Sequence, residues 1–339
     1  MTFSLRTIAA AASLAAAALA IAEPFRVIIP LSDDDNGAMA RLTNYDTGAQ
    51  LDSVLVADGA AVFTGDIDEP ILARVTIDSE RTPSFVLESG TIALSKDGEF
   101  FGTMLNDQLR AFSAEVKAIA EKYRNASDEE EQAALYARYN AALDSALVEN
   151  ADTPLGLFYF LQSDATQLDA AALRQRLARF PQIAKSQRVK TILDAAEKRE
   201  ATSVGHKFVD FEVTYDGKTS RLSDYVGKGH YTLVDFWASW CGPCIRQTAV
   251  LKDIYREYKD KGLEVLGVAV WDNPDDTKRA IEQHELPWPS IIGAGTIPTD
   301  LYGIAGIPCI ILFGPDGTIL SRDKQDDALR ADVAAHLAD

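Results

Sequence analysis

The sequence predicts a C-terminal α/β domain over residues 203–339, preceded by a small antiparallel β domain over 23–101 and a helical segment over 102–200. Three observations support this division. Short apolar runs bounded by Gly, Pro, Asp or Asn fill the first part, and apolar residues recur at helical steps in the second. In the third, apolar strand-like runs alternate with helical patterns, which is typical of an α/β sheet. With 339 residues, the chain has room for two or three domains.

Short apolar runs predict the strands of the first domain. They lie at 25–29, 54–56, 61–64, 71–77, 84–87 and 91–94, and turn residues such as Asp58-Gly59 separate them. Such spacing is typical of a small antiparallel sandwich or barrel. The segment carries no Cys, no His and no clustered site, so the sequence assigns it no chemistry.

The helical segment begins with an amphipathic pattern in which Leu105, Leu109 and Phe112 share one face. Ser127 precedes a run of acidic residues, which predicts an N-cap followed by an acidic first turn. Further helices are expected from Pro154 to 161, over 168–180 and over 183–200.

The C-terminal domain opens with a predicted hairpin, 209–215 and 219–222, around Asp216-Gly217. Apolar strands follow at 231–236 and 263–270, with a helix at 274–284 and a further helical turn at 299–302. A second hairpin, 310–313 and 318–320, and a helix over 324–338 end the chain.

The sequence Cys241-Gly242-Pro243-Cys244 stands between the strand 231–236 and the helix that follows it. A cysteine at a helix N-terminus is favoured as a thiolate by the unpaired N–H groups and the helix dipole. Gly242 permits a tight turn, and Pro243 suits a first helical position. Cys244 lies one turn later, so the pair can close and reopen a short disulfide. A zinc site would require a second Cys or His pair at ligand spacing, and the sequence has none.

The segment 234–244, Val-Asp-Phe-Trp-Ala-Ser-Trp-Cys-Gly-Pro-Cys, resembles the active-site segment of the thioredoxin superfamily. The region from about 203 to 339 is similar to the exported TlpA/ResA-like thiol–disulfide oxidoreductases of that superfamily. The resemblance implies a thioredoxin fold and no cofactor. More loosely, 23–101 is similar to a β-rich domain of unknown function that often precedes TlpA-like proteins.

The resemblance adds two positions to the cysteine pair. Ile307-Pro308 matches the cis-proline site that faces the cysteines, with the Ile307 backbone free to pair with a substrate strand. Asp235 matches the buried acid behind the pair, and a carboxyl in an apolar strand is suited to exchange a proton with Cys244. Catalytic roles are therefore expected for Cys241, Cys244, Asp235 and Pro308, and substrate-binding roles for Trp240, Gly242, Pro243 and Ile307.

The expected activity is the reduction of protein disulfides outside the cytoplasm through a mixed disulfide, as in cytochrome c maturation. The expected partners are proteins that carry disulfides and a membrane electron donor of the DsbD/CcdA type. The alternatives are a disulfide oxidase or isomerase, or a surface binding protein whose region 23–200 has the main role. Gln247 departs from the Glu of ResA-like proteins, which argues against a specialised cytochrome substrate.

The remaining cysteine, Cys309, follows the proline site. It is expected to be a small buried residue; otherwise it could form a regulatory disulfide or a third soft metal ligand. The sequence around the cysteines does not fit two other classes of protein with a related fold. A peroxiredoxin requires Thr where Ala238 stands, and a Sco-type copper chaperone requires one more residue between the cysteines.

Residues 1–22 carry one charged side chain, Arg6, followed by an Ala-rich apolar run over 7–22 that ends in Ala20-Ile21-Ala22. This pattern predicts a secretory signal peptide, with an uncleaved membrane anchor as the alternative. The 51 acidic and 33 basic residues give a formal net charge of −18. Such a surface repels nucleic acid and anionic lipid, so neither is expected as a partner.

Overall fold

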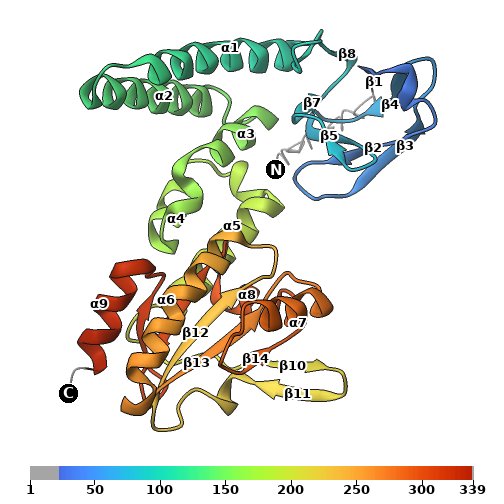
Figure 1. Ribbon diagram of the computed structural model, residues 1–339. Coiled ribbons are helices and arrows are strands. Elements are labelled where there is room, and N and C mark those ends of the chain that lie inside the picture. Colours follow the sequence, from blue (N-terminus) through green and yellow to red (C-terminus); the bar gives the residue numbers. More distant parts are fainter. Residues whose placement is uncertain (1–22, 338–339) are drawn as a thin grey trace, which may run out of the picture. The chain divides into compact units, whose positions relative to one another are not determined.

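The computed structural model describes residues 23–337 (Figure 1). The chain separates into two compact units, Met1–Ser163 and Asp164–Asp339. The helices that the sequence groups into one segment, 102–200, are therefore divided between the two units. The predicted signal peptide, 1–22, lies outside the described residues.

The described part of the first unit, from residue 23, contains two sheets. One has the order β4 (Ala60–Ile67), β1 (Glu23–Pro30), β8 (Gly90–Leu94), β9 (Phe100–Phe101). The other has the order β3 (Gln50–Leu55), β2 (Met39–Asn44), β5 (Ile71–Ile77), β6 (Glu80–Arg81), and β7 (Phe85–Leu87) also pairs with β5. Alternating residues such as Val27, Ile29, Leu42 and Phe63 are fully buried and form the core of this domain.

The β domain differs from the prediction in its strand pairing and in its strands: besides β2, the short strands β6 and β9 were not predicted. The pairing of β1 with β8 is parallel, so the domain is not purely antiparallel. The strand β2 was not predicted, although it lies between β3 and β5. Its only large apolar residues are Met39 and Leu42, which is too few to make a recognisable strand pattern.

From residue 102 to residue 163 the first unit is helical, with α1 (Met104–Asn125), α2 (Glu129–Glu149) and α3 (Pro154–Gln162). The start of α1 is fixed to the β domain by Asn106, whose side-chain nitrogen donates to the Val86 carbonyl at 2.7 Å. The expected N-cap of α2 is wrong by one residue, because Asp128 accepts from the Glu131 N–H at 2.8 Å. Ser127 instead donates its own N–H to the Glu131 side chain at 3.0 Å.

The second unit begins with α4 (Ala170–Leu177) and α5 (Gln187–Ala201). Its sheet has the order β14 (Ser290–Ile291), β13 (Leu263–Ala269), β12 (Tyr231–Trp237), β15 (Cys309–Phe313), β16 (Ile319–Arg322). The pairings of β14 with β13 and of β13 with β12 are parallel. The strand β15 pairs antiparallel with both of its neighbours, β12 and β16. A separate hairpin is formed by β10 (Glu212–Tyr215) and β11 (Lys218–Arg221). The helices that follow are α6 (Gly242–Tyr258), α7 (Pro274–Gln283), α8 (Ile297–Tyr302) and α9 (Asp326–Leu337).

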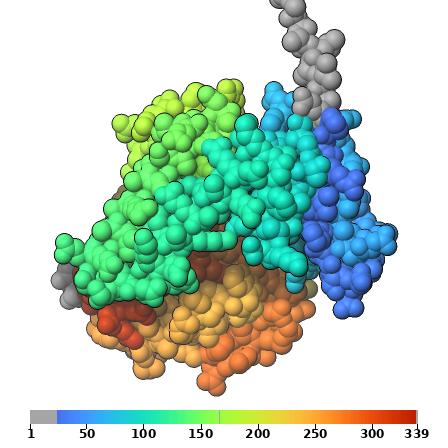
Figure 2. Space-filling view, turned by 90° about the horizontal axis from the view of Figure 1, so that it is seen from above, coloured from blue at the N-terminus to red at the C-terminus, as the bar shows by residue number. Residues whose placement is uncertain are grey.

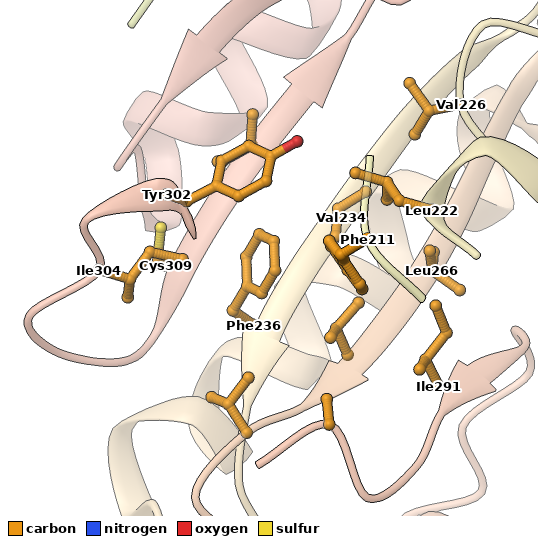
Figure 3. Packing of buried hydrophobic residues seen from close by; sticks show 14 of the residues in the cluster. Phe211, Leu222, Val226, Val234, Phe236, Leu266, Ile291, Tyr302, Ile304 and Cys309 are labelled. Atoms are coloured by element: carbon orange, nitrogen blue, oxygen red, sulfur yellow. The ribbon is translucent and has the colours of Figure 1, made fainter. Parts of the chain in front are cut away.

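Each face of this sheet carries its own core. Val234 and Phe236 of β12 point into one core together with Tyr302 of α8 and Phe211 near the hairpin (Figure 3). Leu233 of β12 points to the other face, where residues of α6 and α9 cover it. This division places Asp235, which alternates with Val234 and Phe236, on the same face as Leu233.

The helix α5 is held closely against α8 of the same unit. A Cβ added to Gly303 would lie 2.1 Å from the Ala195 carbonyl oxygen, so the two backbones can approach only because Gly303 has no side chain. Its φ of 58° is also a left-handed conformation that favours glycine. Within residues 23–337 no helix is both long and apolar enough to span a bilayer.

Candidate active site

The two cysteines of the motif form a disulfide at the start of α6, with Cα atoms 5.3 Å apart. Cys241 is the N-cap residue, and its sulfur accepts from the Cys244 backbone N–H at 3.2 Å. Gly242 and Pro243 occupy the first helical positions and are exposed, whereas both sulfurs are nearly buried. An N–H group aimed at the Cys241 sulfur stabilises a thiolate there once the disulfide is reduced.

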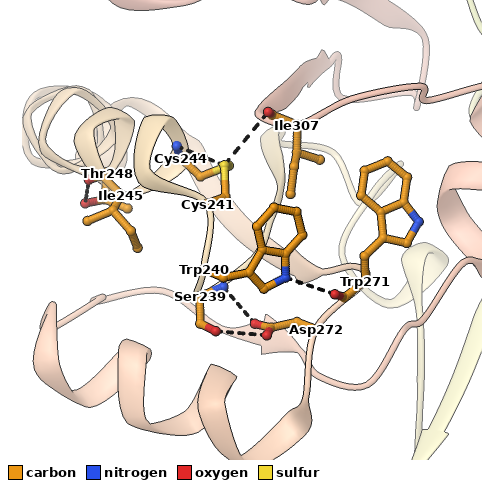
Figure 4. The surroundings of a disulfide bond; sticks show 9 residues. All are labelled: Ser239, Trp240, Cys241, Cys244, Ile245, Thr248, Trp271, Asp272 and Ile307. Carbon is orange, nitrogen blue, oxygen red and sulfur yellow. Dashed lines mark hydrogen bonds between the residues drawn. A yellow bond between two sulfur atoms is a disulfide. The ribbon is translucent and has the colours of Figure 1, made fainter. Parts of the chain in front are cut away.

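The segment before Cys241 is held by Asp272, which follows β13 (Figure 4). One carboxylate oxygen of Asp272 accepts from the Ser239 N–H at 2.7 Å, and the other accepts from the Ser239 hydroxyl at 2.8 Å. Thr277 of α7 donates to the same carboxylate at 2.8 Å. This anchor was not predicted from the sequence. Its only signal was an Asp three residues after the end of a buried parallel strand, at the edge of the sheet where the active-site loop also begins.

Trp240 is an exposed aromatic residue next to the disulfide. Its ring is 63% exposed, and its Nε1 donates to the Trp271 carbonyl at 3.0 Å, which fixes the ring orientation (Figure 4). Ile307 lies on the other side of the sulfur, with its carbonyl oxygen 3.8 Å from the Cys241 sulfur. The Ile307–Pro308 peptide bond is cis, as the resemblance predicted. Apolar side chains and a backbone carbonyl therefore surround the sulfur of Cys241.

Asp235 is buried in β12, with 2% of its surface exposed. Burial alone raises the pKa of its carboxyl from 3.8 to about 7. Within the described residues its Oδ1 has no hydrogen-bond partner. A carboxyl group with a pKa near neutrality can either accept or release a proton under physiological conditions.

Cys309 is buried, and its thiol donates to the Asp323 carboxylate at 3.2 Å. Burial and the neighbouring Asp323 charge raise the pKa of this thiol well above its usual value. The residue belongs to the core with Phe236 and Tyr302, as expected of a small buried group (Figure 3). Over residues 23–337 no group of three or more His, Cys, Asp or Glu side chains is arranged to hold a metal ion.

Gln247 lies one turn after Cys244 on α6 and is buried. Its side-chain amide faces Asp326 at the start of α9; in the amide orientation that satisfies both groups, it donates to the carboxylate at 3.0 Å and accepts from the backbone N–H at 3.2 Å. The residue that departs from the ResA-like pattern therefore links α6 to α9.

Two family models match the chain. Residues 204–322 match the AhpC/TSA family, and residues 25–109 match a domain of unknown function, DUF4369. The first match covers the sheet and the cysteine pair. The second covers the β domain and the start of α1.

Curated relatives match the C-terminal part. The thiol–disulfide oxidoreductase ResA of Bacillus thuringiensis subsp. konkukian is 30% identical over 128 residues, which is 38% of this chain and 73% of the relative. ResA of Oceanobacillus iheyensis is 32% identical over 121 residues, 34% of this chain and 62% of the relative. The crystal structure of the thioredoxin domain of a thiol–disulfide oxidoreductase from Bacteroides vulgatus is 30% identical, covers 40% of this chain and 98% of that chain, and has a TM-score of 0.36.

The fold of residues 204–322 and the disulfide at the start of α6 define a thiol–disulfide oxidoreductase with a thioredoxin-like fold. The chain belongs to the family of ResA-like thiol–disulfide oxidoreductases and carries a DUF4369 domain before its catalytic domain.

Proposed function

We propose that this protein reduces protein disulfides outside the cytoplasm through the Cys241–Cys244 dithiol. The observation that carries the proposal is the position of Cys241. It caps α6, its sulfur receives the Cys244 N–H, and the cis-Pro308 segment faces it. A sulfur in this position is activated as a thiolate and lies beside the cis-Pro308 segment, where a substrate strand would pair.

In the first step, the Cys241 thiolate attacks one sulfur of a substrate disulfide. A mixed disulfide forms, and the other substrate sulfur leaves as a thiolate. Trp240 and Ile307 flank the attacked bond, and the Ile307 backbone pairs with the substrate strand. Gly242 and Pro243, both exposed, leave space for that strand above the helix start.

In the second step, Cys244 attacks the Cys241 sulfur and releases the second substrate thiolate. Cys244 is buried, so its proton requires an acceptor inside the protein. Asp235 fulfils this role, because burial holds its pKa near 7. The substrate gains two electrons, and the enzyme is left with the Cys241–Cys244 disulfide.

The direction of transfer is inferred from the residues between the cysteines. Gly-Pro is the pair of thioredoxin, a reductant with a potential of roughly −270 mV. Reducing equivalents then have to be restored by a membrane donor of the DsbD/CcdA type, because the expected signal peptide exports the chain. Disulfide-bearing proteins, including apocytochrome c, are the proposed substrates.

The test is a redox titration of the mature protein in dithiothreitol and glutathione buffers, following the Cys241–Cys244 bond. A reductase should have a potential near thioredoxin's, roughly −270 mV. A value above that of protein disulfide isomerase, roughly −180 mV, would contradict the reductive direction and favour the oxidase or isomerase. Replacing Cys241 by Ser tests the remaining alternative, since a binding protein would keep its function.

A further inference from the structure

Three buried polar atoms without a hydrogen-bond partner in the described residues lie close together beneath the active site. They are Oδ1 of Asp235, Nε1 of Trp237 and Oγ of Ser290. Leaving such atoms unpaired costs free energy, so their grouping requires an explanation.

The strand register places these three side chains on one face of the sheet. Asp235 of β12 pairs with Gly267 of β13, and Gly267 pairs with Ser290 of β14. Residues directly opposite each other on neighbouring strands point to the same side. The adjacent residues Phe236 and Ile291 point into the opposite core, as Figure 3 shows.

Gly267 marks the point at which the polar atoms converge. A Cβ added there would lie 2.8 Å from the Ser290 hydroxyl oxygen and 3.1 Å from the Trp237 indole nitrogen. The Ser290 hydroxyl oxygen and the Trp237 indole nitrogen are therefore at most about 6 Å apart. One water molecule can bridge such a distance with two ordinary hydrogen bonds. Asp235 lies opposite Gly267 on the neighbouring strand, whose backbone is about 4.8 Å from that of β13, and its unpaired oxygen supplies a third partner.

We propose that Gly267, Trp237 and Ser290 form a binding site for one water molecule, which hydrogen-bonds to Asp235 and exchanges its proton. The inference rests on the proposed role of Asp235 in deprotonating Cys244. Trp237 donates its indole N–H to this water, Asp235 accepts from it, and the Ser290 hydroxyl completes its partners.

The site gives the buried carboxyl a route to solvent. Trp237 packs with Cys241 and Cys244, and these side chains separate the Asp235 carboxyl from solvent on the active-site side. Ser290, in contrast, lies on β14, an edge strand of the sheet, and the residue is partly exposed although its hydroxyl oxygen is buried. The carboxyl passes its proton to the water, the water passes one to the Ser290 hydroxyl, and that hydroxyl passes one to solvent when the edge strand opens locally. One proton reaches solvent, and no electrons move.

The kinetic test separates the two steps of the reaction in single-turnover experiments with a disulfide peptide. Ser290→Ala removes one partner of the water, which then supports the charged carboxylate less well. We expect the release step to slow about tenfold at pH 7 and its pH midpoint to rise by about one unit, with the first step unchanged. The Cys309 thiol on β15 interacts electrostatically with Asp235, and Cys244 on α6 is its proposed proton donor; both remain in the variant.

Two matched variants serve as controls. Ser290→Thr keeps the hydroxyl and should behave as the parent. Ser321→Ala makes the same change at a buried position on the far edge strand, β16, and should also have no effect. If Ser290→Ala behaves like Ser321→Ala, the water site is wrong. If Asp235→Asn leaves the release step unchanged, the proposed role of Asp235 fails as well, and the two failures are thereby distinguished.

A direct measurement uses the Trp237 indole N–H as a probe, assigned in NMR spectra by Trp237→Phe. A cross-peak between this proton and a bound water is expected in the parent protein. Gly267→Ala should abolish it, because the added methyl group fills the site. Absence of the cross-peak in the parent would overturn the proposal, even if Gly267→Ala fails to fold.

Discussion

Replacing Asp235 by Asn should stabilise the folded protein at alkaline pH. The raised pKa means that between about pH 4 and 7 the folded state holds a proton that the unfolded state has released. The free energy of unfolding therefore falls as the pH rises through this range, and it levels off above the folded pKa.

The size of the effect follows from the shift in pKa from 3.8 to about 7. Each pKa unit corresponds to about 1.4 kcal/mol, so the raised pKa of Asp235 lowers the free energy of unfolding by about 2 kcal/mol at pH 5.5, where the folded carboxyl is still protonated, and by about 4 kcal/mol at pH 8.5, where it is ionised. Asn is similar in size to Asp and does not ionise. Its advantage over Asp should therefore grow by about 2 kcal/mol between these two pH values.

Denaturant unfolding of the oxidised full chain, followed by tryptophan fluorescence, measures this difference. All four tryptophans, Trp237, Trp240, Trp271 and Trp288, lie in the second unit, so the signal reports on the domain that contains Asp235. The exposed Asp260→Asn serves as the control and should show no such pH dependence. An equal stability difference at pH 5.5 and 8.5 would show that Asp235 is not a buried carboxyl titrating near neutrality.

Three further outcomes are expected. Cys244→Ser should retain the mixed disulfide on Cys241, visible as a substrate adduct in non-reducing gels and by mass; rapid release of the substrate would show that another group performs the second step. Asp272→Asn should lower the free energy of unfolding by about 1–3 kcal/mol, because an amide cannot accept every bond that the carboxylate accepts, and unchanged denaturation would contradict the anchoring role. Gly303→Ala should cost about 2 kcal/mol or more, since its methyl group would lie 2.1 Å from the Ala195 carbonyl oxygen; an unchanged melting temperature would show that α5 and α8 separate easily.

The active-site residues could be predicted from the sequence because their signals are local. The Cys-Gly-Pro-Cys motif, the strand before it and the Ile307-Pro308 dipeptide are each recognisable within a few residues. The disulfide and the cis peptide confirm the expected geometry. The catalytic and binding roles of these residues stay predictions.

The parts that the sequence did not predict depend on residues that are distant along the chain. Asp272 holds Ser239 across 33 positions, and nothing local marks either residue as a partner of the other. The parallel pairing of β1 with β8 joins strands that are more than sixty residues apart, so it depends on how the whole domain folds. The strand β2 follows the same rule, because its two neighbours stabilise it more than its own sequence does.

The environment of Cys309 has a practical consequence for labelling the protein. A thiol that is buried, is hydrogen-bonded to a carboxylate and has a raised pKa reacts slowly with alkylating reagents. In the folded, reduced enzyme, Cys241 at the start of α6 is therefore the first sulfur that a maleimide or iodoacetamide should reach. A single fluorophore can therefore be attached to Cys241 without mutating Cys309, and the labelled chain, whose nucleophile is blocked, reports on the active site in a form that cannot turn over.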